Sequence, residues 1–307
     1  MTGRIRVIAA IRIWPSSGAR LSGILASPAL GERGSAALAD LLTRIEQQPS
    51  EVLDAIARSM NVRAAEPAML SICARYMAGI AVFGTRALEV GCGNGAATKL
   101  ILQHLRPATL IGIDPSPFFV TMASEAFKHE PRVSFAVAEA ASTGQSDAAF
   151  DLVIAHTVYS HLVDPVSALS EAWRVLKPGG QLVIFDGDFA TLTVALFDGD
   201  PLQSAVSAVL RNMVHAPYIM RRLPALIGAA GFCVQSLEPH GYVQTASPDY
   251  LLTLLSRGTM AAGQTGEIGQ MLVDGFQREA QRRVANGTFY GAMLFLSLTA
   301  RKIDGAG

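Results

Sequence analysis

The chain has 307 residues, of which 50% are hydrophobic and 16% charged, and its 25 basic residues balance its 25 acidic residues. This length allows one large domain or two small ones, each with a real core. No apolar run approaches the roughly 18–20 residues that cross a bilayer, so we expect no membrane insertion. A formal charge of zero gives no electrostatic attraction to nucleic acid.

Cysteine usage points to a reducing compartment. The three cysteines, Cys73, Cys92 and Cys233, are widely separated and form no metal-ligand spacing. We therefore expect a cytoplasmic protein without a metal site.

Residues 1–34 are expected to form an N-terminal extension outside the main fold. Residues 4–14 are apolar but contain interspersed arginines, and they lack the clean apolar centre and cleavage site of a signal peptide. Residues 16–34 are rich in Gly, Ser, Pro and Ala, which is typical of a linker. We favour an extra strand or a loosely ordered extension, and this apolar stretch could also form a homodimer interface.

Residues 35–84 are expected to form an N-terminal helical cap. Apolar residues recur there at helical spacing, Ser50 is expected to cap one helix, and Pro67 stands in the first turn of another. The expected helices cover 35–46, 50–60 and 66–80.

From residue 86 onward, short apolar segments alternate with amphipathic ones. The expected strands cover 86–90, 109–113, 133–138, 150–155 and 181–186. The expected helices between them cover 96–105, 117–127 and 165–176. This alternation is typical of parallel strands covered by helices, so residues 85–307 are predicted to form a Rossmann-like, doubly wound α/β domain.

After residue 186 the pattern becomes mainly helical. Further helices are expected over 201–215, 221–230 and most of 247–284. Strands are expected over 233–237, with an extension through 242 as the alternative, and over 289–300. The two late strands predict an antiparallel edge on the sheet. The helical segments near 190–218 and 247–286 interrupt the strands and are expected to form an inserted lid.

The strand at 86–90 runs directly into three glycines at alternate positions, Gly91, Gly93 and Gly95. Glycines between a strand and a helix leave backbone N–H groups and the positive helix end open to a ligand. The spacing G-x-G-x-G behind Glu89 differs from the G-x-G-x-x-G of dinucleotide-binding proteins. The turn therefore predicts a ligand other than a dinucleotide.

Polar residues also follow the other expected strands, where ligands of open parallel sheets bind. Asp114 follows the second strand, where its carboxylate could accept hydrogen bonds from a ribose diol or cap the next helix. Glu139 follows the third, and the carbonyls of residues 155–157 follow the fourth, where they could receive an ammonium group. Together with Glu89, these carboxylates suit a nucleoside with a cationic tail and would repel a pyrophosphate.

Four ordered segments resemble class I S-adenosylmethionine-dependent methyltransferases, in the small-molecule branch that includes the ubiquinone and menaquinone biosynthesis type. They are LEVGCGNG (88–95), IGIDPS (111–116), FDLVIAHTVYSHLVDP (150–165) and EAWRVLKPGGQLVIFD (171–186). The resemblance is strong over residues 85–185, and FYGAMLFLSLTARK (289–302) resembles the final antiparallel strand of that family. It implies S-adenosyl-L-methionine as the cofactor.

The resemblance also implies where the cofactor binds. Residues 89–95 would surround its methionyl part, Asp114 its ribose and Glu139 its adenine, with Phe118 beside the adenine. The implied cofactor-binding residues are Glu89, Gly91, Cys92, Gly93, Gly95, Asp114, Pro115, Ser116, Glu139, Ala140, Ala155 and His156.

Methyl transfer needs an aligned nucleophile, exclusion of water and, for an O–H or N–H acceptor, removal of a proton. His156, Tyr159 and His161 follow the fourth strand, and histidine has a pKa suited to a base near neutrality. These three are the candidate catalytic residues. Each also has a structural interpretation, and His161 with Leu162 resembles a recurrent family feature that packs the following turn.

We therefore expect methyl transfer to an O, N or C nucleophile of a small, largely apolar molecule, such as a secondary metabolite or a quinone-like compound. The lid segments motivate this, because they are poor in charge and rich in Leu, Met, Ala and Val. Residues 155–159 contain neither an Asn/Asp-Pro-Pro-aromatic box nor a Pro-Cys nucleophile, which disfavours nucleic acid as the substrate. The alternatives are a methyltransferase-like protein that binds the cofactor without methyl transfer, and a nicotinamide-dependent oxidoreductase.

Overall fold

The computed structural model describes residues 45, 47–80, 84–245 and 248–303. The chain divides into two units, Met1–Ala37 and Leu38–Gly307, and the following description concerns the second. The expected N-terminal extension and nearly all of the helix expected over 35–46 lie outside the described residues. The division into cap, main domain and lid stays a prediction.

A seven-stranded sheet in the order β3-β2-β1-β4-β5-β7-β6 forms the centre of the described unit. Its strands are β1 (Arg86–Val90), β2 (Thr109–Asp114), β3 (Val133–Val137), β4 (Phe150–His156), β5 (Leu176–Thr193), β6 (Phe232–Gln244) and β7 (Gly291–Lys302). The first five strands are parallel, and β7 runs antiparallel to both β5 and β6. The predicted doubly wound, mostly parallel sheet with a late antiparallel edge is confirmed.

Helices alternate with the parallel strands and then accumulate after β5. They are α1 (Ser50–Ala65), α2 (Pro67–Ala78), α3 (Ala96–His104), α4 (Pro117–Ala126), α5 (Pro165–Val175), α6 (Pro201–Met213), α7 (Ile219–Ala229), α8 (Asp249–Gln264) and α9 (Gln270–Ala285). A short 3-10 helix, η2 (Tyr159–His161), follows β4. No helix in the described ranges is long and apolar enough to span a bilayer.

Several helix starts share one local pattern, a capping side chain followed by proline. Glu66, Ser116, Asp164 and Asp200 each accept a backbone N–H hydrogen bond at the start of a helix whose first turn holds a proline. Proline suits this position because its missing N–H has no intrahelical partner there. The expected cap at Ser50 is wrong: the N-cap of α1 is Pro49, which makes no side-chain capping bond.

One late element differs from expectation. β5 covers 18 residues instead of 181–186, because pairing with β7 continues through Asp188 and Thr193. The mostly helical character expected over 247–284 is confirmed, and the segment forms two helices, α8 and α9, separated by a turn in which Gly266 has a φ of +74°. A left-handed residue cannot continue a right-handed helix, so the chain turns there.

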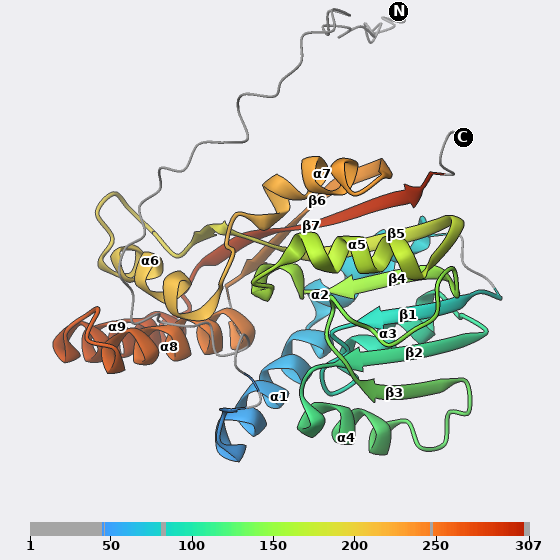
Figure 1. Cartoon of the computed structure of the whole chain (residues 1–307). Coiled ribbons are helices and arrows are strands. Elements are labelled where there is room, and N and C mark those ends of the chain that lie inside the picture. Colours follow the sequence, from blue (N-terminus) through green and yellow to red (C-terminus); the bar gives the residue numbers. More distant parts are fainter. Residues whose placement is uncertain (1–44, 46, 81–83, 246–247, 304–307) are drawn as a thin grey trace, which may run out of the picture. The chain divides into compact units, whose positions relative to one another are not determined.

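Buried apolar clusters cover both faces of the sheet. Leu152 and Ile154 of β4 belong to the cluster that includes α2 and α3, whereas Val153 and Ala155 belong to the cluster that includes α5 and α7. Successive strand residues point to opposite faces, so a strand covered on both sides is apolar throughout. Figure 1 shows α5 and α7 along one face of the sheet.

The strand order reverses beside β1, which pairs with β2 on one side and with β4 on the other. Ligands of open α/β sheets bind outside the carboxyl ends of the strands at this point. The helices α1, α6, α8 and α9 lie on the side toward which the parallel strands point (Figure 1), and α8 packs against α1, α6 and α9.

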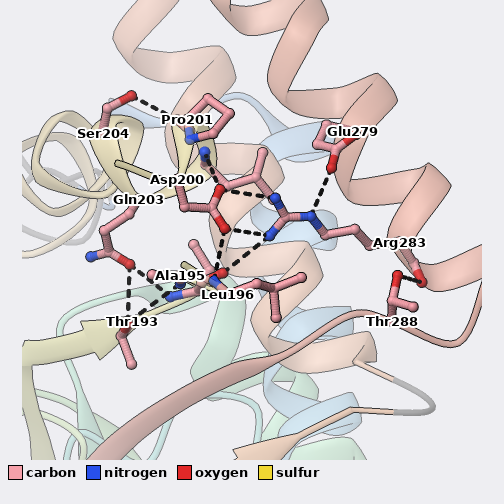
Figure 2. A network of polar contacts seen from close by, with 12 residues as sticks. Thr193, Ala195, Leu196, Asp200, Pro201, Gln203, Ser204, Glu279, Arg283 and Thr288 are labelled. Carbon is pink, nitrogen blue, oxygen red and sulfur yellow. Dashed lines mark hydrogen bonds and ion pairs between the residues drawn. The ribbon is translucent and has the colours of Figure 1, made fainter. Parts of the chain in front are cut away.

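A buried ion pair joins the segment after β5 to α9 (Figure 2). The Arg283 guanidinium donates from Nη1 to Asp200 Oδ2 at 2.8 Å and from Nη2 to Asp200 Oδ1 at 2.9 Å. Their side chains are only 2% and 0% exposed. Asp200 also accepts from the backbone N–H of Leu202 and so caps α6. This pair therefore connects α6 with α9.

Candidate functional site

The glycine turn after β1 leaves no space for side chains. Gly91, Gly93 and Gly95 have φ values of +70°, +53° and +85°, in the left-handed region that favours glycine. A Cβ atom at Gly91 would lie 2.4 Å from Cγ2 of Val158, and one at Gly93 would lie 2.9 Å from Sδ of Met60. The turn is tied to β2, because the N–H groups of Gly91 and Cys92 donate to the carbonyl of Ile113 at 2.8 and 2.9 Å.

Glu89 lies at the end of β1 and is fully buried. Its Oε2 accepts a hydrogen bond of 2.6 Å from the Thr98 hydroxyl, whereas its Oε1 has no hydrogen-bond partner. Burial, with a smaller contribution from the charge of Asp114, raises the pKa of Glu89 to about 8. A buried carboxyl oxygen without a partner fits a ligand that brings a cation or an N–H donor beside the glycine turn.

Asp114 ends β2 and holds the glycine turn in place. Its Oδ2 accepts from the N–H of Gly93 and its Oδ1 from the N–H of Ser116, both at 2.9 Å. Burial raises the pKa of Asp114 to about 6, although the hydrogen bonds from the N–H groups of Ser116 and Gly93 lower it in part. Ser116, not Asp114, caps α4. Each carboxylate oxygen can accept a second hydrogen bond, so Asp114 retains capacity for a diol.

A cavity of about 340 Å³ lies over the turn and the strand ends, and we call it the larger cavity by comparison with an adjoining cavity of about 90 Å³. Among the expected site residues, those that line it are Gly91, Asp114, Pro115, Glu139, Ala140 and His161. The other expected residues lie outside its lining and are buried: Glu89, Cys92, Gly93, Gly95, Ser116, Ala155, His156 and Tyr159. The larger cavity is acidic, because Asp114, Glu139 and Asp164 line it.

Several residues that line the larger cavity are not among the site residues expected from the sequence. Met60 comes from α1, and Val158 and Leu162 come from the loop after β4. The ring expected beside the adenine is Phe118, but Phe119 lines the cavity and Phe118 packs against the small cluster between α1 and α4. Adjacent helix residues point about 100° apart, and the phase of α4 depends on its packing.

A second cavity of about 90 Å³, the smaller cavity, adjoins the larger one. Met60, Thr157 and His161 line both. The remaining walls of the smaller cavity come from α1, the end of β5, α6 with the residue after it, and α8: Ile56, Ser59, Arg63, Phe189, Met213, Val214, Tyr250, Leu254 and Arg257. No sequence motif marks this set, since its members are brought together from distant parts of the chain.

Thr157 stands at the junction of the two cavities in an unusual backbone conformation. Its φ is +57°, although it is neither glycine nor asparagine. The N–H of Thr157 donates to the carbonyl of Phe185 at 2.6 Å, and its hydroxyl donates to the carbonyl of His156 at 2.7 Å. A β-branched residue in this region stores about 1–3 kcal/mol of strain, a feature that clusters at functional sites.

The three candidate catalytic residues have different surroundings. His156 is 5% exposed, and its Nδ1 lies 3.0 Å from the Tyr76 hydroxyl. Burial, helped by the charge of Arg63, lowers the pKa of His156 to about 3. Tyr159 is also buried, and burial raises its pKa. Among these three, His161 alone lines a cavity, and it lines both.

The 3-10 helix that carries His161 is anchored by Asp186. This fully buried carboxylate accepts from the N–H and the hydroxyl of Ser160, both at 2.9 Å, and from the N–H of Gly187 at 2.8 Å. Burial raises the pKa of Asp186, and the charge of His161 is the largest influence that lowers it. Asp186 therefore holds η2, and with it His161, in position.

Comparisons with known proteins identify relatives. Residues 88–184 match the methyltransferase domain family. The chain is 30% identical over 262 residues to an uncharacterized 37.1 kDa protein in transposon TN4556 of Streptomyces fradiae, covering 83% of this chain and 68% of that protein. It is 32% identical over 162 residues to trans-aconitate 2-methyltransferase of Methylobacterium radiotolerans, covering 53% of this chain and 56% of that enzyme.

A solved structure has the same fold. Haemonchus contortus phosphoethanolamine N-methyltransferase 2, in complex with S-adenosyl-L-methionine, aligns with a TM-score of 0.52 at 18% identity, over 89% of this chain and 61% of that chain. The family match spans β1 to β5, the segment that holds the glycine turn and the acidic strand ends. Residues 88–184 of the chain therefore belong to the methyltransferase domain family.

Proposed function

We propose that this protein transfers the methyl group of S-adenosylmethionine to a small-molecule acceptor, with the donor in the larger cavity and the acceptor in the smaller one. The observation that carries the proposal is the shared wall of Met60, Thr157 and His161. Two ligands in adjoining cavities would meet at this wall. Such alignment is the main requirement of a displacement whose leaving group is already good.

The residues of the larger cavity fit the donor. Its sulfonium supplies an electrophilic methyl group and a neutral leaving group. Asp114 would accept from the ribose hydroxyls. Glu89 is buried outside the cavity lining, and its unpartnered oxygen would hold the ammonium of a donor that reaches the glycine turn. Phe119 and Ala140 offer an apolar face to the adenine. The acidic lining complements a ligand with two positive charges.

We propose His161 as the proton acceptor for an O–H or N–H acceptor molecule. It lines both cavities, and the hydrogen bonds from Ser160 to Asp186 hold the 3-10 helix that carries it. We assign His156 and Tyr159 positioning roles because their side chains are buried. The apolar walls around the junction, among them Met60 and Phe189, would exclude water from the transfer.

The substrate class, the location and the oligomeric state are proposed from the composition of the chain. The zero formal charge supports a small molecule over nucleic acid as substrate. Three free cysteines support a cytoplasmic location. A homodimer through the apolar N-terminal stretch is the remaining proposal, and size-exclusion chromatography with light scattering tests it.

The experiment uses S-adenosylmethionine with a deuterated methyl group and a metabolite extract, with mass spectrometry to find the acceptor that gains the label. Wild type should label one small molecule, and His161→Gln should reduce the rate by about 10²–10⁴-fold while donor affinity stays unchanged. A protein that binds the donor but labels nothing supports the alternative of binding without transfer.

Donor binding is tested separately by calorimetry with S-adenosylhomocysteine. Wild type should bind it, and Asp114→Ala should weaken the affinity by more than about tenfold, which corresponds to about 1.4 kcal/mol. A wild-type protein without affinity for S-adenosylhomocysteine would contradict the proposed function.

A further inference from the structure

Among the described residues, the linings of the two cavities carry opposite charge. The larger is lined by Asp114, Glu139 and Asp164, whereas the smaller is lined by Arg63 and Arg257. No residue in the described lining of the smaller cavity is acidic. A neutral, wholly apolar acceptor would need neither arginine. The lining therefore indicates the charge of the molecule that fits there.

Arg63 lies in the last turn of α1 and is half-buried. Its guanidinium carbon lies 5.8 Å from the centre of the Tyr250 ring. Within the described ranges, its guanidinium forms no ion pair with a carboxylate. A partly desolvated guanidinium facing a cavity favours an anion there, because Coulomb attraction is stronger than in water.

The charge of Arg63 also acts on buried groups nearby. Burial raises the pKa of Cys73 and of Tyr242, and the charge of Arg63 lowers both. Burial lowers the pKa of His156, and the charge of Arg63 lowers it further. These groups belong to α2, β6 and β4. The positive charge is therefore directed into the protein and not only toward solvent.

Arg257 brings a second guanidinium from α8 to the same cavity. The methionyl carboxylate of the donor is one anion and could occupy one guanidinium in a bidentate pair. Such a pair takes two of the five N–H donors of one guanidinium, so the two arginines together offer donors for a second anionic group. Beside them, Ile56, Met213 and Leu254 form an apolar wall. The cavity thus combines anion-binding groups with space for a short hydrocarbon part.

We infer that the smaller cavity binds an acceptor that carries a carboxylate, with Arg63 and Arg257 holding the anionic group and the apolar wall holding the rest of the molecule. This inference rests on the proposed function, because it names the chemical class of the acceptor in that reaction. The acceptor is then an amphiphilic organic acid and not a neutral apolar metabolite.

The test compares two acids with their neutral amides: hexanoate with hexanamide, and 3-phenylpropanoate with 3-phenylpropanamide. Binding to the full chain is measured by calorimetry in saturating S-adenosylhomocysteine. At least one acid should bind wild type about tenfold or more tightly than its amide. Arg63→Gln and Arg257→Gln should each remove most of this preference, and Arg63→Lys should retain part of it.

Arg58→Gln is the matched control, because Arg58 lies on the exposed side of the same helix α1. It should keep the preference for the acid. Thermal unfolding of every variant shows whether it folds. No acid preference in wild type, or a preference unchanged in both glutamine variants, overturns the inference.

A second arm separates the acceptor from the donor as the source of the carboxylate. 5′-Methylthioadenosine lacks the aminoacyl part of the donor. If Arg63→Gln weakens binding of S-adenosylhomocysteine but leaves 5′-methylthioadenosine and the acids unaffected, Arg63 binds the donor and the inference is overturned. If S-adenosylhomocysteine binds wild type and all variants equally well but the acids show no preference, the inference about the acceptor is overturned and the proposed function is not. Only a failure of S-adenosylhomocysteine to bind wild type contradicts the proposed function.

Discussion

The larger and the smaller cavity share a wall but are built in different ways. The larger follows the ends of neighbouring parallel strands, so its polar groups are held by the sheet and by hydrogen bonds such as Gly93 to Asp114. The smaller is assembled from α1, α8 and the elements after β5. The first has acidic walls and the second basic ones. Under the proposed function, donor binding is tied to the sheet, and acceptor choice depends on how helices pack beyond it.

The two regions should also respond differently to substitution. A change at the strand ends should alter donor affinity directly, whereas a change among the late helices should alter stability or acceptor binding. Three experiments test this difference.

The largest effect is expected from the buried ion pair that anchors α9. Arg283→Met leaves Asp200 buried without its partner, which should reduce the free energy of unfolding by about 3–5 kcal/mol. Urea denaturation followed by circular dichroism measures this. Arg282→Met is the matched control: Arg282 is 61% exposed and also contacts Glu279, so little change is expected. An equal reduction of the free energy of unfolding in the two variants would show that the buried ion pair does not stabilise the fold.

Gly91→Ala tests the glycine turn. The change places a Cβ atom 2.4 Å from Val158 at a φ of +70°, so the turn must shift and donor affinity should fall by more than about tenfold. Gly144→Ala is the control, because Gly144 has a φ of +68° but nothing within 4 Å of the added atom. Both should lose on the order of 1–2 kcal/mol of stability from left-handed strain. Calorimetry should show a weaker affinity for S-adenosylhomocysteine in Gly91→Ala and an unchanged affinity in Gly144→Ala. An unchanged affinity in Gly91→Ala would refute a close approach of the ligand to the turn.

The third effect is a pH dependence that arises from Glu89. Its pKa is about 8 in the folded protein against an ordinary 4.5, so between these values the folded state holds a proton that the unfolded state has released. The Glu89 contribution to stability therefore falls as pH rises through that window. A ligand ammonium favours the carboxylate, so affinity for S-adenosylhomocysteine should increase from pH 6.5 to 8 by up to about tenfold per unit.

Glu89→Gln should flatten this increase. 5′-Methylthioadenosine has no ammonium group and should show little dependence on pH with the wild-type protein. A steep dependence that survives in Glu89→Gln would assign the titration to another group.

The elements and the donor side were predictable because their signals are local. The alternation of apolar segments predicted the order of strands and helices, and the strand ends predicted that Asp114, Glu139 and Gly91 would lie on one edge of the sheet. In the structure these three line one cavity. Their placement needs only that parallel strands end together, a property of any sheet of this type.

The three catalytic candidates show the limit of this reasoning. His156, Tyr159 and His161 lie within six positions of each other in the sequence, so spacing alone gave no way to choose among them. Their orientations depend on the left-handed conformation of Thr157 and on the hydrogen bonds from Ser160 to Asp186. Those contacts bury two of the candidates and turn the third toward the cavities.

By itself, the sequence determined the mostly parallel sheet, the glycine turn and the acidic character of the donor side, because strand periodicity and strand ends are properties of consecutive residues. Only the tertiary structure decided that Arg63 and Arg257 would line one cavity, and that Met60 of α1 would cover Gly93. The physical reason is that these contacts join helices far apart in the chain. Their relative position is set by packing between apolar surfaces, which no local pattern encodes.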